Sequence, residues 1–401
     1  MAGNLGPVLR HLRDHGPRSR ARLASELGLT RSAVSAIVAD LEERGLVRAA
    51  GIERGGLGRP GTSVELDGHT VCGIGAEINV NHVATIALDL SGSVVSEHRL
   101  AIESNKVAPG EVLDRLVELV AGTEQDVRAA GAETVGLVAG VAGLLDRTRD
   151  LLTVAPNLGW RDVPVGAEIR SRLDASYPVV IENEGNLAAI AEAVPGDPQR
   201  QDILVIFGEV GVGGGIVADG RLLRGRQGYA GEFGHMIVDP GGRRCGCGRV
   251  GCWETVGGLR ALLGAAADPD DPVRDPALSL DQRLDEINRR ADLGDTRTLA
   301  ALDQVGAWIG IGAAMLTNAL NPAAIVLSGY FADVGHHMRH AIEEQLQAGV
   351  LAPHAGGTRV ELSTLGFTAA VRGGATVALE SVFEDPSLVE RSQAAVPGGA
   401  R

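Results

Sequence analysis

The chain has 401 residues, of which 44% are apolar and 22% charged, enough for two or three globular units with separate cores. It contains no run of about 18 apolar residues, so we expect no membrane span. The first residues, MAGNLGPVLRHLRDHG, place charges within their apolar pattern and do not form a secretory signal. We therefore expect a cytoplasmic protein.

The net charge of −14 is unevenly distributed. Residues 1–63 hold ten Arg against six acidic residues, a net charge of +4, which leaves −18 on the rest of the chain. A basic segment on an acidic body indicates that this segment meets a polyanion, although chance remains an alternative on charge alone.

Three helical patterns occupy residues 5–50. Ser19 begins the second pattern as its N-cap, and Thr30 begins the third. Gly28 makes the turn between these two helices, and Gly45 ends the third before a strand starts at Leu46. The residues that we expect to be buried are Leu5, Val8, Leu9, Leu12, Leu23, Leu27, Val34, Ile37, Val38 and Leu41.

Two short helices joined by a glycine turn are typical of the helix-turn-helix, whose second helix enters the major groove of DNA. A plain helical hairpin is the alternative. The following segment, VRAAGIERGGLGRPGTSVEL, predicts a winged hairpin. Arginines at its glycine-rich tip suit a narrow minor groove, or simply lie in a linker. The candidate DNA contacts are Ser19, Arg20, Arg31, Ser32, Ser35, Arg54 and Arg59.

From Val71 the pattern changes to strands and helices in an order that occurs twice, which predicts two similar α/β lobes with a ligand cleft between them. We divide the chain into a winged helix-turn-helix with its linker (1–63), a two-lobed body (70–388) and a disordered tail (389–401). The stretch 264–296, rich in Asp and Pro, is expected to be a loop beside helices.

Three cysteines crowd into residues 245–252, which in a cytosolic chain points to metal. Together with EFGH at 232–235 and Trp253-Glu254, the segment CGCGRVGC resembles the zinc and sugar motifs of the ROK family of repressors, open reading frames and kinases. The resemblance spans roughly residues 5–385 and implies an actin-like, hexokinase-like ATPase fold. Its repressor branch carries an N-terminal winged helix.

His235, Cys245, Cys247 and Cys252 match the family's zinc ligands, and three thiolates with one imidazole suit a closed, structural tetrahedral zinc site. Cys72, alone on a strand, is expected to be a core residue. For sugar binding, the resemblance implies Asn183, Glu184, Glu232, His235 and Glu254, with Asn157 as a further candidate. Carboxylates and amides supply the hydrogen-bond acceptors that sugar hydroxyls need. Trp160 and Trp253 are expected to be packing residues.

The kinase machinery of the family is degraded in this chain. Active members have Asn-Asp where this chain has Asn183-Glu184, so the position of the catalytic base carries a longer carboxylate. Their first phosphate loop, Asp-x-Gly-Gly-Thr-Lys, corresponds to residues 77–82, EINVNH, which lack the glycines, Thr and Lys. In the second loop, Glu209-Val210-Gly211 replaces Gly-Thr-Gly and brings a carboxylate toward the phosphates. We expect no ATP binding and no catalytic residue.

These observations predict a sugar-responsive regulator, a repressor, that binds palindromic operator DNA as a homodimer or dimer of dimers. Its effector would be a mono- or disaccharide or a sugar phosphate, and its metal a structural Zn²⁺. Two alternatives remain: a DNA-tethered, ATP-dependent sugar kinase that retains low activity through Glu184, and a regulator with a closed cleft that binds no sugar.

Overall fold

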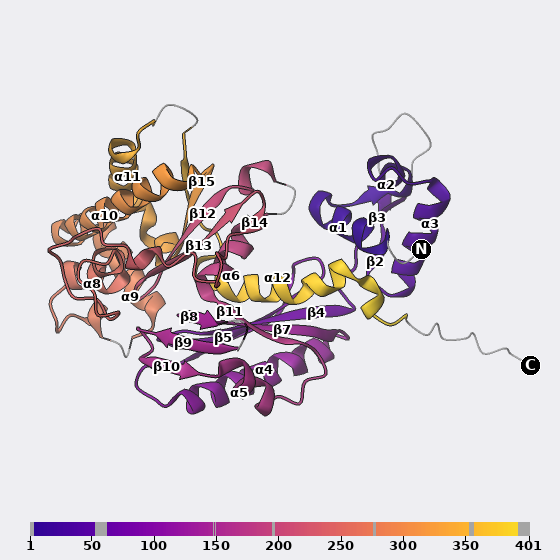
Figure 1. The fold of residues 1–401 in the computed structure, drawn as a ribbon, viewed down its shortest axis with the longest axis horizontal. Helices are drawn as coiled ribbons and strands as arrows, with labels where there is room; N and C mark the ends of the chain where they lie inside the picture. Colours follow the sequence, from indigo (N-terminus) through magenta and orange to yellow (C-terminus); the bar gives the residue numbers. More distant parts are fainter. Residues whose placement is uncertain are drawn as a thin grey trace, which may run out of the picture.

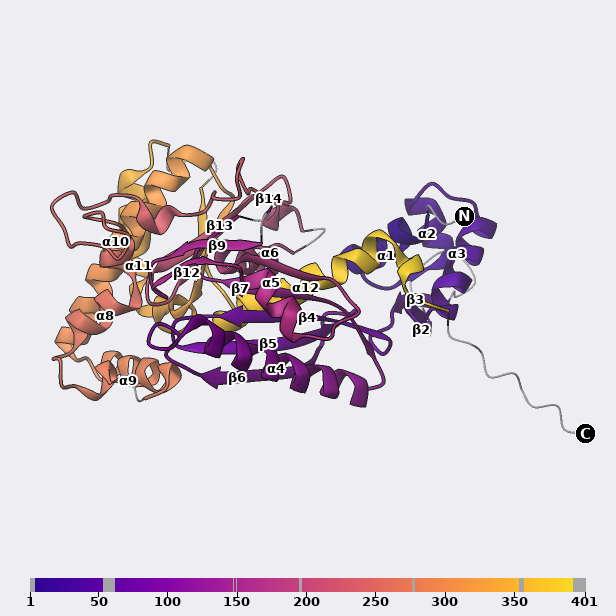
Figure 2. The ribbon, with the colours of Figure 1, turned by 60° about the horizontal axis from the view of Figure 1, so that its bottom comes forward.

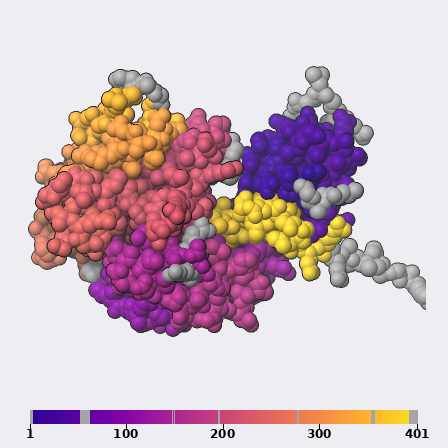
Figure 3. Space-filling model, viewed as in Figure 1, coloured from indigo at the N-terminus to yellow at the C-terminus, as the bar shows by residue number. Residues whose placement is uncertain are grey.

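The computed structural model describes residues 4–52, 62–146, 148, 150–194, 197–275, 278–352 and 357–391. It consists of an N-terminal winged head and two α/β lobes (Figure 1). The head lies at one end of the molecule, and the space-filling view shows it seated on the far end of helix α12, beyond the lobes (Figure 3).

The head begins with three helices whose apolar faces meet. Of the residues predicted to be buried there, all are buried except Leu27, which is half-buried. The Oγ1 of Thr30 accepts a hydrogen bond from the backbone N–H of Ala33 at 3.2 Å, as expected of an N-cap. Ser19 also precedes its helix, but its side chain makes no capping hydrogen bond. The helices are α1 (Leu5–His15), α2 (Arg20–Glu26) and α3 (Arg31–Glu43).

The wing is a sheet of three strands in the order β1-β3-β2. Its strands are β1 (Arg18–Ser19), β2 (Val47–Ile52) and β3 (Thr62–Leu66). The predicted end of this unit at residue 63 therefore falls inside β3, which continues to Leu66 because Val64 faces the core of the head. The tip, with the candidate contacts Arg54 and Arg59, lies outside the described residues.

The first lobe is built on a five-stranded sheet in the order β11-β7-β4-β5-β6, with α4 and α5 on one face and α12 on the other (Figures 1 and 2). A small sheet, β10-β9-β8, extends it. The elements are β4 (Val71–Ile78), β5 (His82–Asp89), β6 (Val94–Ala101), α4 (Pro109–Ala129), β7 (Glu133–Val141), β8 (Leu144–Asp146), β9 (Leu151–Ala155), β10 (Trp160–Val163), α5 (Val165–Arg172), β11 (Val179–Asn183) and α6 (Glu184–Glu192).

The second lobe repeats this plan in the order β14-β13-β12-β15-β16. In each lobe the first strand of the unit is central, antiparallel to the next strand and parallel to a later one. The elements of the second lobe are η2 (Pro198–Arg200), β12 (Ile203–Gly208), β13 (Val212–Ala218), β14 (Arg221–Leu222), η3 (Phe233–His235), α7 (Glu254–Gly257), α8 (Leu259–Ala266), η4 (Pro272–Arg274), α9 (Leu280–Asp292), α10 (Thr296–Leu320), β15 (Ala324–Gly329), α11 (Tyr330–Gly349), β16 (Arg359–Leu362) and η5 (Gly366–Thr368).

The expectation of a loop over 264–296 is wrong, because α9 lies within it. Ser279 and Gln282 form a capping box at the start of α9, and Leu284 and Ile287 bury its inner face. The Asp and Pro residues that suggested a loop belong mainly to the preceding connection. The next helix, α10, has the length and mean hydropathy of a membrane span, but 56% of that apolar window is buried inside the fold.

The C-terminal helix α12 (Ala369–Glu384) joins the head to the lobes. Arg10 donates to the carbonyl oxygen of Phe383 at 3.0 Å, and Arg13 pairs with Glu380 at 2.8 Å. After η6 (Pro386–Leu388), Val389 is buried and accepts a hydrogen bond from Arg44. The disordered tail predicted from 389 is therefore wrong for residues 389–391, and residues 392–401 lie outside the described part.

Candidate functional site

A pocket of about 500 Å³ opens between the two lobes. Its wall includes all the residues that the sequence proposed for sugar binding, namely Asn157, Asn183, Glu184, Glu232, His235 and Glu254. It lies at the carboxyl ends of parallel strands, where open α/β sheets usually bind ligands. The structure thus brings together side chains that are up to 97 residues apart in the chain.

One side of the pocket is the junction between β11 and α6. The Oδ1 of Asn183 caps α6 by accepting from the backbone N–H of Asn186 at 3.1 Å, and its Nδ2 donates to the Gly143 carbonyl at 3.0 Å. Glu184 is the first residue of α6, where the partial positive charge of the helix N-terminus favours a carboxylate. The Asn183 side chain is therefore fixed by the backbone around it.

The other side of the pocket is formed by the start of η3 and of α7. Glu232 precedes η3, which ends at His235, and Glu254 begins α7. Glu254 is a shared partner: its Oε2 accepts from Asn157 Nδ2 at 3.4 Å, and its Oε1 lies 2.7 Å from Cys245 Sγ. Burial raises the pKa of Glu232, and the charge of Glu254 adds to this, while His235 opposes it.

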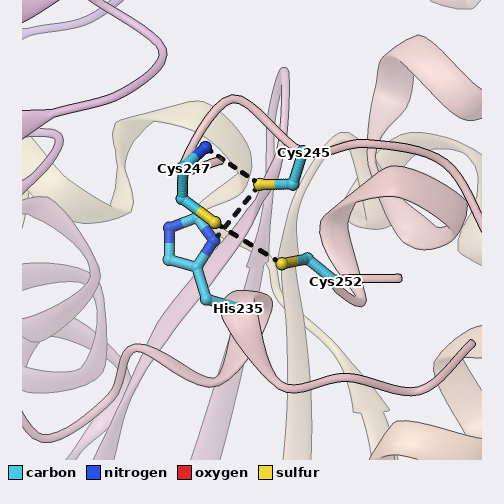
Figure 4. Close-up of side chains that lie close together, drawn as sticks. All are labelled: His235, Cys245, Cys247 and Cys252. Carbon is cyan, nitrogen blue, oxygen red and sulfur yellow. Dashed lines mark hydrogen bonds between the residues drawn. The ribbon is translucent and has the colours of Figure 1, made fainter. Parts of the chain in front are cut away.

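The four predicted metal ligands converge beside this wall. Their ligand atoms all lie within 4.8 Å of one another, and the side chains of His235, Cys245, Cys247 and Cys252 point inward (Figure 4). The Sγ atoms of Cys247 and Cys252 are 3.6 Å apart, and Cys245 Sγ is 3.7 Å from His235 Nδ1. With zinc–sulfur bonds of about 2.3 Å, ligands of one tetrahedral zinc ion are separated by roughly these distances.

His235 belongs to both the metal cluster and the pocket. Its Nδ1 faces Cys245, whereas its Nε2 lies 4.0 Å from the Glu232 carboxylate. An imidazole held by metal at one nitrogen can donate from the other, so a metal bound by the cluster would fix the direction in which His235 offers a hydrogen bond.

The glycine-rich loop between β12 and β13 forms a tight turn, closed by the hydrogen bond from Glu209 N–H to the Gly211 carbonyl at 3.0 Å. A Cβ at Gly211 would meet Glu254 Oε2 at 2.3 Å, and one at Gly185 would meet the Gly214 carbonyl oxygen at 2.5 Å. Gly211 in the loop therefore allows close contact with α7, and Gly185 in α6 allows close contact with the glycine-rich segment.

Buried carboxylates occupy the place that corresponds to the two phosphate loops. Glu77 is fully buried and Glu209 is 8% exposed. Asn79 Nδ2 lies between two acidic partners, 3.0 Å from Glu77 Oε1 and 3.3 Å from Glu184 Oε2. Burial raises the pKa of Glu184 well above its usual value, and the charges of Glu209, Glu77 and Glu232 raise it further.

The candidate DNA-binding face lies on the outer side of α3. Arg31, Ser32 and Ser35 are exposed there, as the helical pattern predicts. The Ser35 hydroxyl donates to the Arg31 carbonyl at 2.9 Å, within its own helix. On α2, Arg20 pairs with Glu42 at 2.8 Å.

Sequence reasoning missed several residues of the pocket wall, including Asn79, Arg161 and Arg249. Asn79 stands in the degraded first phosphate loop, and its place two residues after Glu77 is the signal that could have indicated it. Trp160 lines the pocket as well as packing in the core, whereas Trp253 is a packing residue whose Nε1 donates to the Trp308 carbonyl at 2.8 Å. Cys72 is buried in the core, as expected.

Comparison with known proteins agrees with this architecture. Residues 73–381 match the ROK family, and residues 6–56 match the MarR family. The chain belongs to the ROK family. The MarR-type match covers the helices of the head and its strands β1 and β2, so the resemblance inferred from the motifs is confirmed.

Relatives within the ROK family include regulators and kinases. The xylose repressor of Bacillus subtilis is 28% identical over 378 residues, which cover 94% of this chain and 95% of the repressor. A glucokinase of Halalkalibacterium halodurans is 30% identical over 315 residues, 75% of this chain and 93% of the kinase. The crystal structure of a ROK family transcriptional regulator, described as a homologue of the E. coli MLC protein, superposes with a TM-score of 0.76 at 23% identity and covers 96% of this chain and 98% of that one.

Proposed function

We propose that this protein is a sugar-responsive transcriptional repressor that works in the cytoplasm. The observation that carries the proposal is the presence in one chain of a winged head and of a pocket lined by amide, carboxylate and imidazole groups beside a His-Cys cluster. The xylose repressor of B. subtilis, which is similar over nearly the whole chain, supports it.

The head would bind a palindromic operator, with one α3 in the major groove of each half-site. This requires a homodimer or a dimer of dimers, because a twofold protein matches a twofold site. We assign Arg31, Ser32 and Ser35 to groove contacts, Ser19 and Arg20 to the backbone, and Arg54 and Arg59 to the minor groove. On binding DNA, Arg20 would leave its ion pair with Glu42 and pair with a phosphate of the DNA backbone.

The His-Cys cluster would hold a structural Zn²⁺ through His235, Cys245, Cys247 and Cys252. Soft thiolates with one imidazole suit zinc, and four protein ligands leave no open position for catalysis. The ion would hold the loop that presents His235 and Glu254 to the sugar. The effector is a mono- or disaccharide or a phosphorylated sugar. The phosphorylated sugar is included because the exposed residues Arg161 and Arg249 also line the pocket.

Sugar binding would reach the head through α6 and α12. Asn183 and Glu184 start α6, and a Cβ at Gly373 of α12 would meet the Leu187 carbonyl oxygen of α6 at 1.9 Å. Helices packed this closely move together, so a sugar that prefers one position of α6 would shift α12 and the head.

We propose that the nucleotide half of the site is inactive and binds no ATP, because Glu77 and Glu209 would face the phosphates. A second candidate is a weak sugar kinase, favoured by the Glu184 carboxylate at the base position and by the glucokinase relative. ATP-dependent phosphorylation of hexoses or amino sugars by the wild type, above that of Glu184→Gln, would establish the kinase and reject the inactive site.

The decisive experiment measures binding of the full chain to DNA from its own promoter by fluorescence anisotropy, with a panel of neutral and phosphorylated sugars. We expect one sugar to change the affinity, and Arg31→Glu to abolish binding. The matched control is Arg226→Glu, which makes the same charge change at an exposed lobe position. Equal loss in both variants would reject the head as the DNA reader, and thermal stability unchanged by every sugar would favour the sugar-blind alternative.

A further inference from the structure

A second cluster of metal-ligating side chains lies beneath the sugar pocket, apart from the zinc ligands. Glu77 on β4, His82 at the start of β5 and Glu209 after β12 are all buried, with exposures of 0%, 3% and 8%. One ligand atom from each lies within 4.8 Å of the other two. The two central strands of the lobes, β4 and β12, thus deliver two carboxylates to one enclosed point, and β5 delivers the imidazole.

Two oxygens of this cluster have no hydrogen-bond partner among the described residues. Glu77 Oε1 accepts from Asn79, but Glu77 Oε2 and Glu209 Oε1 are buried and unpartnered. His82 Nε2 is 3.8 Å from Glu77 Oε2, too far for a hydrogen bond. A buried carboxylate oxygen without a partner is costly, so the arrangement calls for a group that is absent from the protein itself.

Several carboxyl groups crowd around this point, and burial together with the neighbouring Glu77 raises the pKa of Glu209 and of Glu184 well above the usual value. Glu184 adds a third carboxylate, held 3.3 Å from the Asn79 amide. The Nη2 atom of the Arg99 guanidinium lies 3.4 Å from His82 Nδ1. Arg99 is exposed to solvent, and its charge lowers the pKa of Glu209 less than burial and the charge of Glu77 raise it. A small, doubly charged ion would neutralise the cluster from within.

We propose that Glu77, His82 and Glu209 bind a divalent transition-metal ion of the Mn²⁺ or Fe²⁺ class. Carboxylates and imidazole together suit these ions. Two ligand atoms that each lie about 2.1–2.2 Å from one ion can be 3.8 Å apart, which is the distance observed between His82 Nε2 and Glu77 Oε2. Coordination through Nε2 puts the His82 proton on Nδ1, so Arg99 then turns away into solvent.

This site differs from a nucleotide-bound magnesium site in its ligands. His82 and Glu209 stand where the kinases of the family have Lys and the first Gly of Gly-Thr-Gly, so the ion would be held by the chain in the absence of any phosphate. It would also sit one side chain away from the sugar, because Asn79 joins Glu77 to Glu184. The proposal does not depend on the identity of the sugar or on DNA binding.

The test titrates Mn²⁺ into the full-length, zinc-loaded protein and counts bound ions by the loss of the free-ion paramagnetic resonance signal. We expect one Mn²⁺ per chain. Glu77→Gln, Glu209→Gln and His82→Gln should each weaken binding at least tenfold. Arg99→Ala should bind as tightly as the wild type or more tightly, because it removes a positive charge and a competing donor. Glu118→Gln, an exposed carboxylate on α4, is the control and should bind normally.

Thermal unfolding separates loss of the site from loss of the fold. Without Mn²⁺, Glu77→Gln and Glu209→Gln should be at least as stable as the wild type, since each removes charge repulsion from a buried cluster. Added Mn²⁺ should raise the midpoint of the wild type alone. Absence of Mn²⁺ binding in the wild type would overturn the proposal, and so would equal binding in Glu77→Gln and Glu209→Gln. Undiminished binding in His82→Gln would overturn the imidazole ligand.

Discussion

The two rims of the sugar pocket differ in what they retain from the ROK architecture. The zinc rim, residues 232–254, keeps a complete ligand set and two carboxylates on the pocket wall. The phosphate rim, residues 77–82 and 209–214, keeps the turn of the glycine loop but buries Glu77 and Glu209 where phosphates would lie. If the proposed function holds, the difference shows that a scaffold can lose one ligand and keep another when separate loops hold them.

The largest effect is expected from removing a ligand of the zinc rim. Cys252→Ser should release the zinc and abolish measurable sugar binding, because structural zinc contributes roughly 10–16 kcal/mol in small zinc domains. Metal analysis and thermal unfolding would measure the loss. Cys72→Ala, which changes a core cysteine of the first lobe, should keep its zinc. If the Cys252→Ser variant retained its zinc, Cys252 would not be a required ligand of the ion.

A carboxylate on the zinc rim should matter more than one on the phosphate rim. Glu232→Gln should weaken sugar binding by roughly 10–100-fold, the equivalent of a hydrogen bond to a charged group of about 1.5–3 kcal/mol. Glu209→Gln should change the affinity less than about threefold, because Glu209 Oε1 is buried and has no hydrogen-bond partner among the described residues. Isothermal titration with the effector compares the two, and equal losses would contradict the division between the rims.

The contact between the two rims can be tested with a pair of glycine variants. Gly211→Ala places a Cβ 2.3 Å from Glu254 Oε2 and should displace that carboxylate, with a loss of sugar affinity of about tenfold. Gly213→Ala in the same loop meets nothing within 4 Å and should bind normally. Equal affinities for the two variants would mean that the position of Glu254 is unimportant.

The smallest effect is expected from the nucleotide itself. Millimolar ATP with Mg²⁺ should not raise the midpoint of thermal unfolding above that with Mg²⁺ alone, because a ligand that does not bind the native state gives no stabilisation. A midpoint of thermal unfolding that rises with ATP concentration would show that the phosphate rim binds the nucleotide.

Local signals in the sequence predicted much of this molecule. Thr30, Gly28 and Gly45 mark the head because caps and turns are set by neighbouring residues, and the motif spacing brought His235 and the cysteines together. The helix α9 was missed because Asp and Pro in the preceding connection outweighed the capping signal at Ser279. The meeting of Glu77 with Glu209 could not be predicted, since it depends on how two sheets face each other across the pocket.

The contacts of the C-terminal segment affect how the head can be reused. Arg44 donates to the Val389 carbonyl, and Arg391 pairs with Asp40 on α3 at 2.9 Å, so both ends of the chain complete one folded unit. A chimera that grafts residues 1–66 onto another sensor would leave Val8, Leu9 and Arg10 without the surface of Phe383. Exchange of DNA specificity between such regulators therefore requires transplanting the last turns of α12 together with the head.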